Sequence, residues 1–321
     1  MSTIRSFLRS RWFSRILAGA VIAGVLSLGS VLEPWGTATG PGRLADDGKL
    51  HVIFFDVGQG DAALIRTPTG EDILVDGGPD TSVIQKLGAA LPKDDRDIEL
   101  LILTHPHADH LTGLLEILRR YQVRRLMMTG VVHTTDVHES FLKEVRNRDI
   151  DTETPRAGEV VSFGETRLEF FWPLEEWSGR RVSETGPGEG GGLNDTSIVF
   201  RLVYGQTEVL FMGDATSEVE EELVVSASST LVSDLLKVGH HGSKYSTSRV
   251  FLAAVDPENA LISSGKGNSY GHPAYRVIKL LRDAGVRILR TDTHGDILAT
   301  SDGGKIDIQT ENEVLASESG N

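Results

Sequence analysis

The 321-residue sequence contains no cysteine, which excludes disulfide bonds and any metal site built on thiolate ligands. Any metal ion must therefore be held by nitrogen and oxygen atoms. Positive charge is also scarce, with 32 Lys and Arg against 46 Asp and Glu and a net charge of −14. An acidic surface repels polyanions, which argues against a broad nucleic-acid-binding face but leaves room for a short basic path into a cleft.

Long hydrophobic runs are absent except for one, from Ile16 to Leu32, which follows a start containing four arginines. This layout predicts an N-terminal hydrophobic helix within residues 1–35, either an uncleaved signal anchor or a signal peptide. No sharp small-x-small cleavage site follows, which favours the anchor. The positive-inside rule places the globular part outside the cytoplasm, so we expect a membrane-anchored or secreted protein.

Residues 36–48 are rich in Gly, Pro and Asp, which predicts a linker. Residues 49–310 are expected to form the globular domain, and residues 311–321 a polar tail. Within 49–310, short strands bounded by turn signals alternate with amphipathic helices. Two successive halves of strands and helices, separated by a glycine-rich mobile loop at 174–195, predict two sheets face to face with helices outside. The expected fold is an α/β four-layer αβ/βα sandwich.

One segment offers four metal ligands within six residues. Thr-His-Pro-His-Ala-Asp-His contains His105, His107, Asp109 and His110 after a buried strand, and imidazole and carboxylate are ligands that zinc and similar ions accept. In an extended segment His105 and His107 point the same way, whereas Asp109 and His110 diverge at the turn into a helix. The segment can therefore serve two neighbouring ions, an arrangement used to hydrolyse phosphoester and acyl bonds.

Three other apolar strands also end in Asp or His. Asp214 is a candidate bridging carboxylate, although a turn or helix-capping aspartate has the same pattern. One of His240 and His241 is expected to bind metal and the other to lie near the substrate, and the sequence leaves open which. Asp76 is expected to orient a ligand histidine.

These motifs together resemble the metallo-β-lactamase superfamily of metal hydrolases. The narrower resemblance is to the branch that contains the extracytoplasmic domain of the competence DNA-uptake protein ComEC. It covers roughly residues 50–300 and rests on the following segments: Phe55-Asp56-Val57-Gly58-Gln59-Gly60-Asp61-Ala62, the His-x-His-x-Asp-His run, Gly213-Asp214-Ala215, Lys237-Val238-Gly239-His240-His241-Gly242-Ser243, Asn268-Ser269-Tyr270-Gly271-His272-Pro273 and Thr291-Asp292.

The resemblance implies a ligand set for two divalent ions, zinc in the first place and manganese as the alternative. The first ion would take His105 and His107, and the second would take Asp109, His110 and one of the histidine pair, with Asp214 as the bridge. Many members of the superfamily carry a further ligand histidine ahead of the bridging aspartate, but Leu193–Ser197 contains none. The first ion would then be bound loosely, unless Asn194 or Asp195 supplies an oxygen.

Two groups of residues are candidate substrate contacts. Ser243 and Lys244 could hold an anionic oxygen, and His272 beside Tyr270 could donate a proton to the leaving group. The predicted catalytic residues are therefore Asp109, Lys244 and His272. In the alternative interpretation, Lys244 is a solvated surface lysine and His272 is a histidine that caps a turn. Three other histidines lack such a context and are expected at the surface: His51, His133 and His138.

The function predicted from the sequence is a dinuclear metal-dependent hydrolase that uses a metal-bridging hydroxide, in particular a ComEC-like phosphodiesterase or nuclease. The expected partners are an anionic phosphodiester, either DNA or a small ester, and a membrane contacted through the N-terminal helix. No protein partner can be read from the sequence. Two alternatives remain open, an esterase for small phosphocholine-type phosphodiesters and a membrane-tethered binding module with a degenerate metal site.

Overall fold

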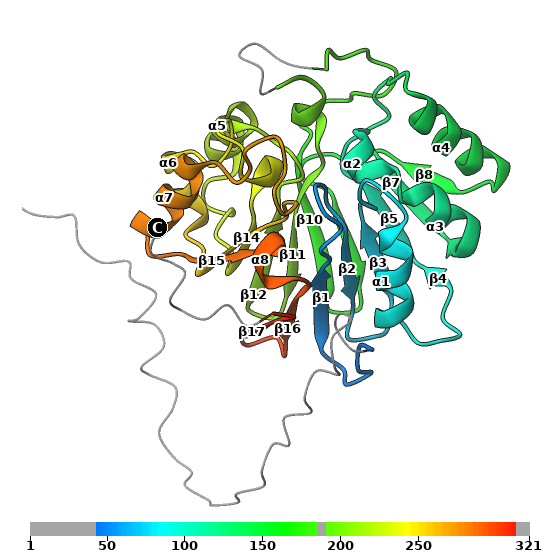
Figure 1. Cartoon of the computed structure of the whole chain (residues 1–321), viewed down its shortest axis with the longest axis horizontal. Helices are drawn as coiled ribbons and strands as arrows, with labels where there is room; N and C mark the ends of the chain where they lie inside the picture. The colour runs from blue at the N-terminus through cyan, green and yellow to red at the C-terminus, as the bar shows by residue number, and fades with distance from the viewer. Residues whose placement is uncertain (1–42, 185–190, 313–321) are drawn as a thin grey trace, which may run out of the picture. The chain divides into compact units, whose positions relative to one another are not determined.

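The computed structural model describes residues 43–184 and 191–312, in which two large sheets lie face to face (Figure 1). The first sheet runs in the order β17 (Ile306–Thr310), β16 (Ile297–Ser301), β1 (Leu50–Phe54), β2 (Ala63–Arg66), β3 (Asp72–Val75), β5 (Leu100–Leu103), β7 (Arg125–Met128) and β8 (Asp151–Glu153). The second runs in the order β15 (Arg287–Arg290), β14 (Asn259–Ile262), β13 (Leu235–Lys237), β12 (Thr207–Phe211), β11 (Val199–Tyr204), β10 (Thr166–Trp172) and β9 (Val160–Phe163). A small sheet pairs β4 (Asp97–Ile98) with β6 (Gln122–Val123).

Helices cover the outer faces of both sheets (Figure 1). The helices that follow strands of the first sheet are α1 (Ser82–Ala90), α2 (Ala108–Leu111), α3 (Leu114–Arg120) and α4 (Asp136–Asn147). Those of the second half are α5 (Ser217–Ala227), α6 (Arg249–Val255), α7 (Tyr275–Asp283) and α8 (Thr291–His294), with the short 3-10 turns η2 (Gly192–Thr196) and η3 (Gly239–Gly242).

Three apolar layers hold this arrangement together. The central layer lies between the sheets and includes Phe54, Phe200 and Phe211, whose rings stack. A second layer packs α1, α3 and α4 on the first sheet, and a third packs α5, α6 and α7 on the second. Because the core strands are covered on both faces, they read as continuous apolar runs such as Leu100–Leu103. The predicted four-layer sandwich is confirmed.

The prediction that each half of the chain forms one sheet is wrong for two pairs of strands. Strands β9 and β10, expected with the first half, belong to the second sheet, while β16 and β17 return to the first sheet. The return is made by antiparallel pairing of β16 with β1, from Leu50 opposite Ser301 to Phe54 opposite Ile297. Element order does not specify such a long-range pair, since hydrophobic pattern alone does not choose the neighbouring strand.

Several predicted segments fall partly or wholly outside the described residues. The N-terminal hydrophobic helix, linker residues 36–42 and the tail from 313 onward lie there, as do residues 185–190 of the predicted loop. Within 43–184 and 191–312, no helix has the length and hydrophobicity needed to span a bilayer. Leu44 is buried, and Gly192–Thr196 of the expected loop forms a buried 3-10 turn instead.

The expectation that three histidines lie at the surface is wrong for two of them. His51 is buried, with Nε2 2.9 Å from the Asp47 carboxylate. His138 is buried on α4, where Nδ1 donates to the carbonyl of His133. His133 itself is half-buried. Each ring has a local polar partner, which allows a histidine to be buried without a functional role.

Asp72 on β3 is expected to make the stability of the fold dependent on pH. Burial raises the pKa of its carboxyl group to about 7; Arg66, which donates to both oxygens, offsets this only in part, and Asp95 and Glu99 add to the rise. A carboxyl group with a raised pKa in the folded state contributes stability while protonated and loses it as pH rises from about 4 to about 7. We therefore expect Asp72→Asn to retain stability at pH 8 that the wild type has lost.

The measurement is urea unfolding of wild type and Asp72→Asn at pH 5 and pH 8. Between pH 5 and pH 8 the unfolding free energy of the wild type should fall relative to that of the variant by about 3 kcal/mol. This value corresponds to the roughly two pH units below the folded pKa of about 7, at about 1.4 kcal/mol per unit. A difference that does not change with pH would contradict the assignment.

Candidate metal centre

The side chains of the centre follow strands whose carboxyl ends meet at one edge of the sandwich. Asp76 follows β3 and His105 follows β5, a parallel pair in the first sheet. Asp214 follows β12 and the histidine pair follows β13, a parallel pair in the second sheet. Residues separated by more than a hundred positions in the sequence therefore lie together.

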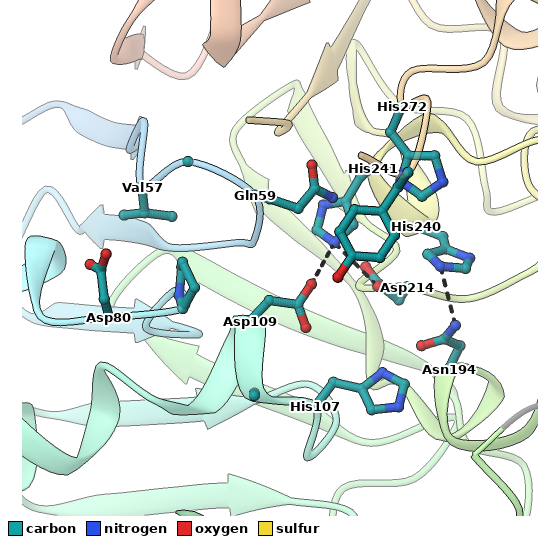
Figure 2. A pocket seen from close by; sticks show the side chains of 14 residues that line it. Val57, Gln59, Asp80, His107, Asp109, Asn194, Asp214, His240, His241 and His272 are labelled. Atoms are coloured by element: carbon teal, nitrogen blue, oxygen red, sulfur yellow. Dashed lines mark hydrogen bonds and ion pairs between the residues drawn. The ribbon is translucent and has the colours of Figure 1, made fainter. Parts of the chain in front are cut away.

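Four side chains form a compact group that could hold one cation: Asp109, His110, Asp214 and His241. His241 Nε2 lies 3.3 Å from carboxylate oxygens of both Asp109 and Asp214 (Figure 2). His110 Nε2 lies 3.4 Å from Asp214 Oδ1. The Nε2 atoms of His110 and His241 and Oδ1 of Asp214 are buried and have no hydrogen-bond partner among the described residues. Buried polar atoms without partners are costly, so this donor set fits a bound divalent ion.

Groups behind the ligands fix how the two rings are presented. His110 Nδ1 donates to Asp76 at 2.8 Å, and Asp76 also accepts from the backbone N–H and hydroxyl of Thr104. His241 Nδ1 donates to the carbonyl of Ser263 at 3.0 Å. Both rings therefore turn Nε2 toward the carboxylates, as is usual for metal-binding histidines with a second hydrogen-bonding partner.

The backbone of η3 separates the two adjacent histidines. His240 and His241 have φ values of 49° and 52°, a left-handed conformation uncommon outside glycine. As a result the rings lie 6.2 Å apart, and only His241 belongs to the four-residue group. His240 instead lies against Asn194, whose amide donates to Nε2 at 3.3 Å (Figure 2).

The ligands expected for a first ion are less complete. His105 Nε2 lies 2.9 Å from His107 Nδ1 and 3.9 Å from Asp214 Oδ2. Asn194 is buried at the edge of the same pocket, with Oδ1 lacking a hydrogen-bond partner. Asp195 does not face the pocket: its carboxylate accepts from the N–H and hydroxyl of Thr216. Of the two proposed oxygen donors, the geometry favours Asn194.

The comparisons with known proteins agree with this geometry. The sequence profile of the Metallo-beta-lactamase superfamily matches residues 55–266. The chain belongs to the metallo-β-lactamase superfamily. It is 29% identical to ComE operon protein 3 of Bacillus subtilis over 79% of this chain and 33% of that protein. It is 30% identical to competence protein ComA of Neisseria gonorrhoeae over 87% of this chain and 38% of that protein.

These curated relatives are much longer proteins, of which the chain spans about a third. A third relative is Recombination protein 2 of Haemophilus influenzae, 28% identical over 81% of this chain and 30% of that protein. Among solved structures, the metallo-β-lactamase fold protein YhfI of Bacillus subtilis aligns with a TM-score of 0.51 at 13% identity, covering 79% of this chain and 100% of that chain. The last comparison supports the fold alone.

The electrostatics of this metallo-β-lactamase centre favour a cation. Burial alone would raise the pKa of Asp214, but His241 and His110 outweigh it and hold the pKa well below its usual value. Burial is likewise outweighed at Asp109, chiefly by His110, and its pKa is about 2. At His110 and His241 burial opposes protonation, yet Asp214 and its neighbours raise both pKa values well above the usual one. The positive charge of the protonated rings compensates the negative charge of the carboxylates, and a bound divalent cation can supply the same compensation.

A pocket of about 700 Å³ opens over the centre. Its lining residues are Val57, Gly58, Gln59, Pro79, Asp80, His107, Ala108, Asp109, Asn194, Asp214, His240, His241, Tyr270 and His272. The expected contacts Tyr270 and His272 lie in this lining, whereas Ser243 and Lys244 do not. Ser243 is buried, with its hydroxyl accepting from Tyr245, and the exposed Lys244 lies over the Tyr245 ring. No lysine or arginine lines the pocket in the described residues.

Two residues next to the centre gain a role that the sequence did not suggest. Lys237 on β13 is buried and donates to Asp61 at 2.6 Å, while Asp61 Oδ1 lies 3.4 Å from His241 Nδ1. A lysine inside an apolar strand is the signal that could have revealed this pair. Gly60 is required beside it, because a Cβ there would lie 2.2 Å from the carbonyl oxygen of Asp109.

Proposed function

We propose that this chain is a metal-dependent phosphodiesterase acting on nucleic-acid phosphodiester bonds outside the cytoplasm. The observation that carries the proposal is the buried group Asp109, His110, Asp214 and His241 at the base of an open pocket. The relatives named for competence and recombination support a nucleic-acid substrate. Hydrolysis of a phosphodiester needs positive charge at the phosphoryl oxygens, and in this pocket bound cations would have to supply it.

The group Asp109, His110, Asp214 and His241 would hold one divalent ion. A second would lie beside His105 and His107, with Asn194 completing its ligands. Such ions polarise a phosphoryl oxygen and lower the pKa of the attacking water. Asp76 and the Ser263 carbonyl keep the ligand rings oriented.

His272 would contact the leaving group from the rim of the pocket. Its ring lies 5.5 Å from that of His240 and 6.2 Å from that of His241. Burial, followed by the two neighbouring imidazoles, lowers the pKa of His272 to about 4. A ring that is neutral at pH 7 would stabilise the leaving oxygen by donating a hydrogen bond rather than as an imidazolium.

An activity screen of the full chain with zinc or manganese tests the proposal. The panel contains single-stranded DNA, bis-p-nitrophenyl phosphate, p-nitrophenylphosphorylcholine and a cephalosporin. We expect metal-dependent hydrolysis of the first two. Turnover of the choline ester alone would favour a small-ester esterase, and turnover of the cephalosporin alone would refute phosphodiester specificity.

The incomplete first ligand set keeps a non-catalytic binding module as a second candidate. Leu193–Ser197, the stretch in which the resemblance to the superfamily implies a further ligand histidine, contains none. Metal analysis separates the two functions: about two equivalents of bound ion support the enzyme, while none under metal-replete conditions supports the module.

Tyr270 is expected to contribute to the recognition of an aromatic group next to the scissile phosphate. Its side chain is 71% exposed at the pocket, and its ring stacks on His272 with centroids 5.9 Å apart. Asn268 fixes the loop by accepting from the N–H groups of Tyr270 and His272. Stacking of a base on an aromatic ring contributes roughly 1–3 kcal/mol.

We therefore expect Tyr270→Ala to raise KM for an oligonucleotide about tenfold or more, with little change in kcat. Tyr270→Phe should retain the wild-type KM. The control substrate is a chain of abasic sites of equal length, for which both variants should match wild type. An equal rise in KM for both substrates would show that Tyr270 does not recognise the base.

A further inference from the structure

A second concave surface lies at the opposite end of the first sheet from the metal centre. The metal ligands follow β5, whereas this surface is built from residues that precede β4, β7 and β8, on the side of β4 and α3 in Figure 1. Because β5, β7 and β8 are parallel, residues before these strands and residues after them lie at opposite ends of the sheet. The surface encloses about 750 Å³.

Five arginines line this surface, which we call the arginine groove: Arg96, Arg119, Arg120, Arg124 and Arg148. The other lining residues include one acidic side chain, Asp149. In a chain of net charge −14, this is a local concentration of guanidinium groups, and it lies apart from the pocket over the metal centre. The acidic remainder of the surface would direct a polyanion to it.

The guanidinium groups are held from the side and remain accessible. Glu116 accepts from Arg119 at 2.7 Å and from Arg120 at 3.0 Å, and Asp97 accepts from Arg124 at 2.7 Å. Two further carboxylates form longer ion pairs: Glu99 lies 3.7 Å from Arg124, and Glu144 lies 3.5 Å from Arg148 and 3.9 Å from Arg119. These acidic partners do not line the groove. The side chains of Arg120 and Arg124 are 59% and 53% exposed, so these ion pairs are weak and leave most of the five N–H donors of each arginine free for a ligand.

A purely structural role explains only part of the cluster. Arg119 and Arg120 lie in the last turn of α3 and Arg148 caps α4, positions where a cation interacts favourably with the helix dipole. Arg96 and Arg124 lie outside any helix, and Arg96 sits over the buried ring of Tyr121. Helix stabilisation therefore gives no reason for these two arginines to face the same groove.

We propose that the arginine groove binds the phosphate backbone of a single-stranded nucleic acid, at a site separate from the metal centre. The planar fork of arginine matches phosphate oxygens, and several such contacts along a chain give salt-dependent affinity. A membrane surface fits less well, because the large apolar side chains exposed in the described residues lie on other segments. The proposal does not depend on hydrolysis, so binding can be tested in an inactive protein.

The test uses the full chain with Asp214→Asn, so that the ligand is not cleaved. Binding of a fluorescein-labelled single-stranded 20-mer is followed by anisotropy as a function of salt. The groove pair is the double variant Arg120→Glu and Arg124→Glu. The control pair is the double variant Arg156→Glu and Arg167→Glu, which changes the net charge by the same amount at side chains that are 45% and 46% exposed. Circular dichroism melts check folding, and Arg96→Glu is a second, independent variant.

The groove pair is expected to raise the dissociation constant at least tenfold, and the control pair less than twofold. Neutral Arg120→Gln with Arg124→Gln should reduce the slope of log K against log salt by about 1.4, from about 0.7 per lost contact to a single strand. If the groove and control pairs lost the same amount of affinity for the oligonucleotide, the overall charge of the protein would explain the effect, and the proposal would be overturned. Loss of binding to phosphatidylglycerol vesicles without loss of oligonucleotide binding would also overturn it, in favour of a lipid surface.

Discussion

Asp214→Asn is expected to abolish metal-dependent hydrolysis and to lower the metal content of the protein. Asp214 is 2% exposed, and its carboxylate lies within 3.4 Å of nitrogen atoms of His110 and His241 and 3.9 Å from His105 Nε2, so it would serve the ligand groups of both expected ions. An amide lacks the negative charge that a carboxylate would offer to a cation, and it leaves the imidazoles without their main counter-charge. The loss of metal affinity should exceed the roughly 10–100-fold typical of residues that only support a ligand.

Two measurements check this result together: bound metal by elemental analysis, and turnover of bis-p-nitrophenyl phosphate. Asp80→Asn is the matched control, because Asp80 lines the same pocket but is exposed, and within residues 43–184 and 191–312 its carboxylate accepts only from the N–H of Ser82. The control should keep wild-type metal content and turnover. Wild-type turnover in Asp214→Asn would remove this residue from the centre and with it the proposed mechanism.

The ligand-bearing strand ends could be predicted from the sequence because each has a local signal. An apolar strand followed by Asp or His indicates an edge where parallel strands converge, and Asp76, His105 and Asp214 all lie at that edge. The choice between His240 and His241 had no such signal. It depends on two consecutive left-handed backbone conformations that the glycines of Gly239–Gly242 do not by themselves dictate.

Long-range pairing was the other part that local patterns could not supply. The strand character of β16 and β17 is evident in the sequence, but their place beside β1 follows from residues about 250 positions apart. Lys244 illustrates the same difficulty at the site. It follows the histidine pair directly, yet the turn after η3 carries it to the surface, away from the pocket lining. Proximity in sequence to a ligand is therefore weak evidence for contact with the substrate.

Lys237→Met is expected to cause the largest loss of stability. The Lys237 ammonium and the Asp61 carboxylate are both buried and lie 2.6 Å apart, joining β13 of the second sheet to the loop between β1 and β2 of the first. Burial alone would raise the pKa of Asp61, but Lys237 and then His241 outweigh it and keep the pKa well below its usual value. Removing the lysine therefore leaves a buried carboxylate without its principal counter-charge, which typically costs about 3–5 kcal/mol.

Thermal unfolding should show the variant melting roughly 10 °C below wild type. Lys305→Met removes a lysine from the ion pair with Asp307, whose side chains are 68% and 63% exposed, and should change the melting temperature by little. Asp61→Asn combined with Lys237→Met removes both charges and should recover part of the loss, because the penalty arises from the unpaired charge rather than from the missing contact. If the double variant is as unstable as the sum of the single ones, the pair stabilises the fold through packing, and its electrostatic role beside His241 is refuted.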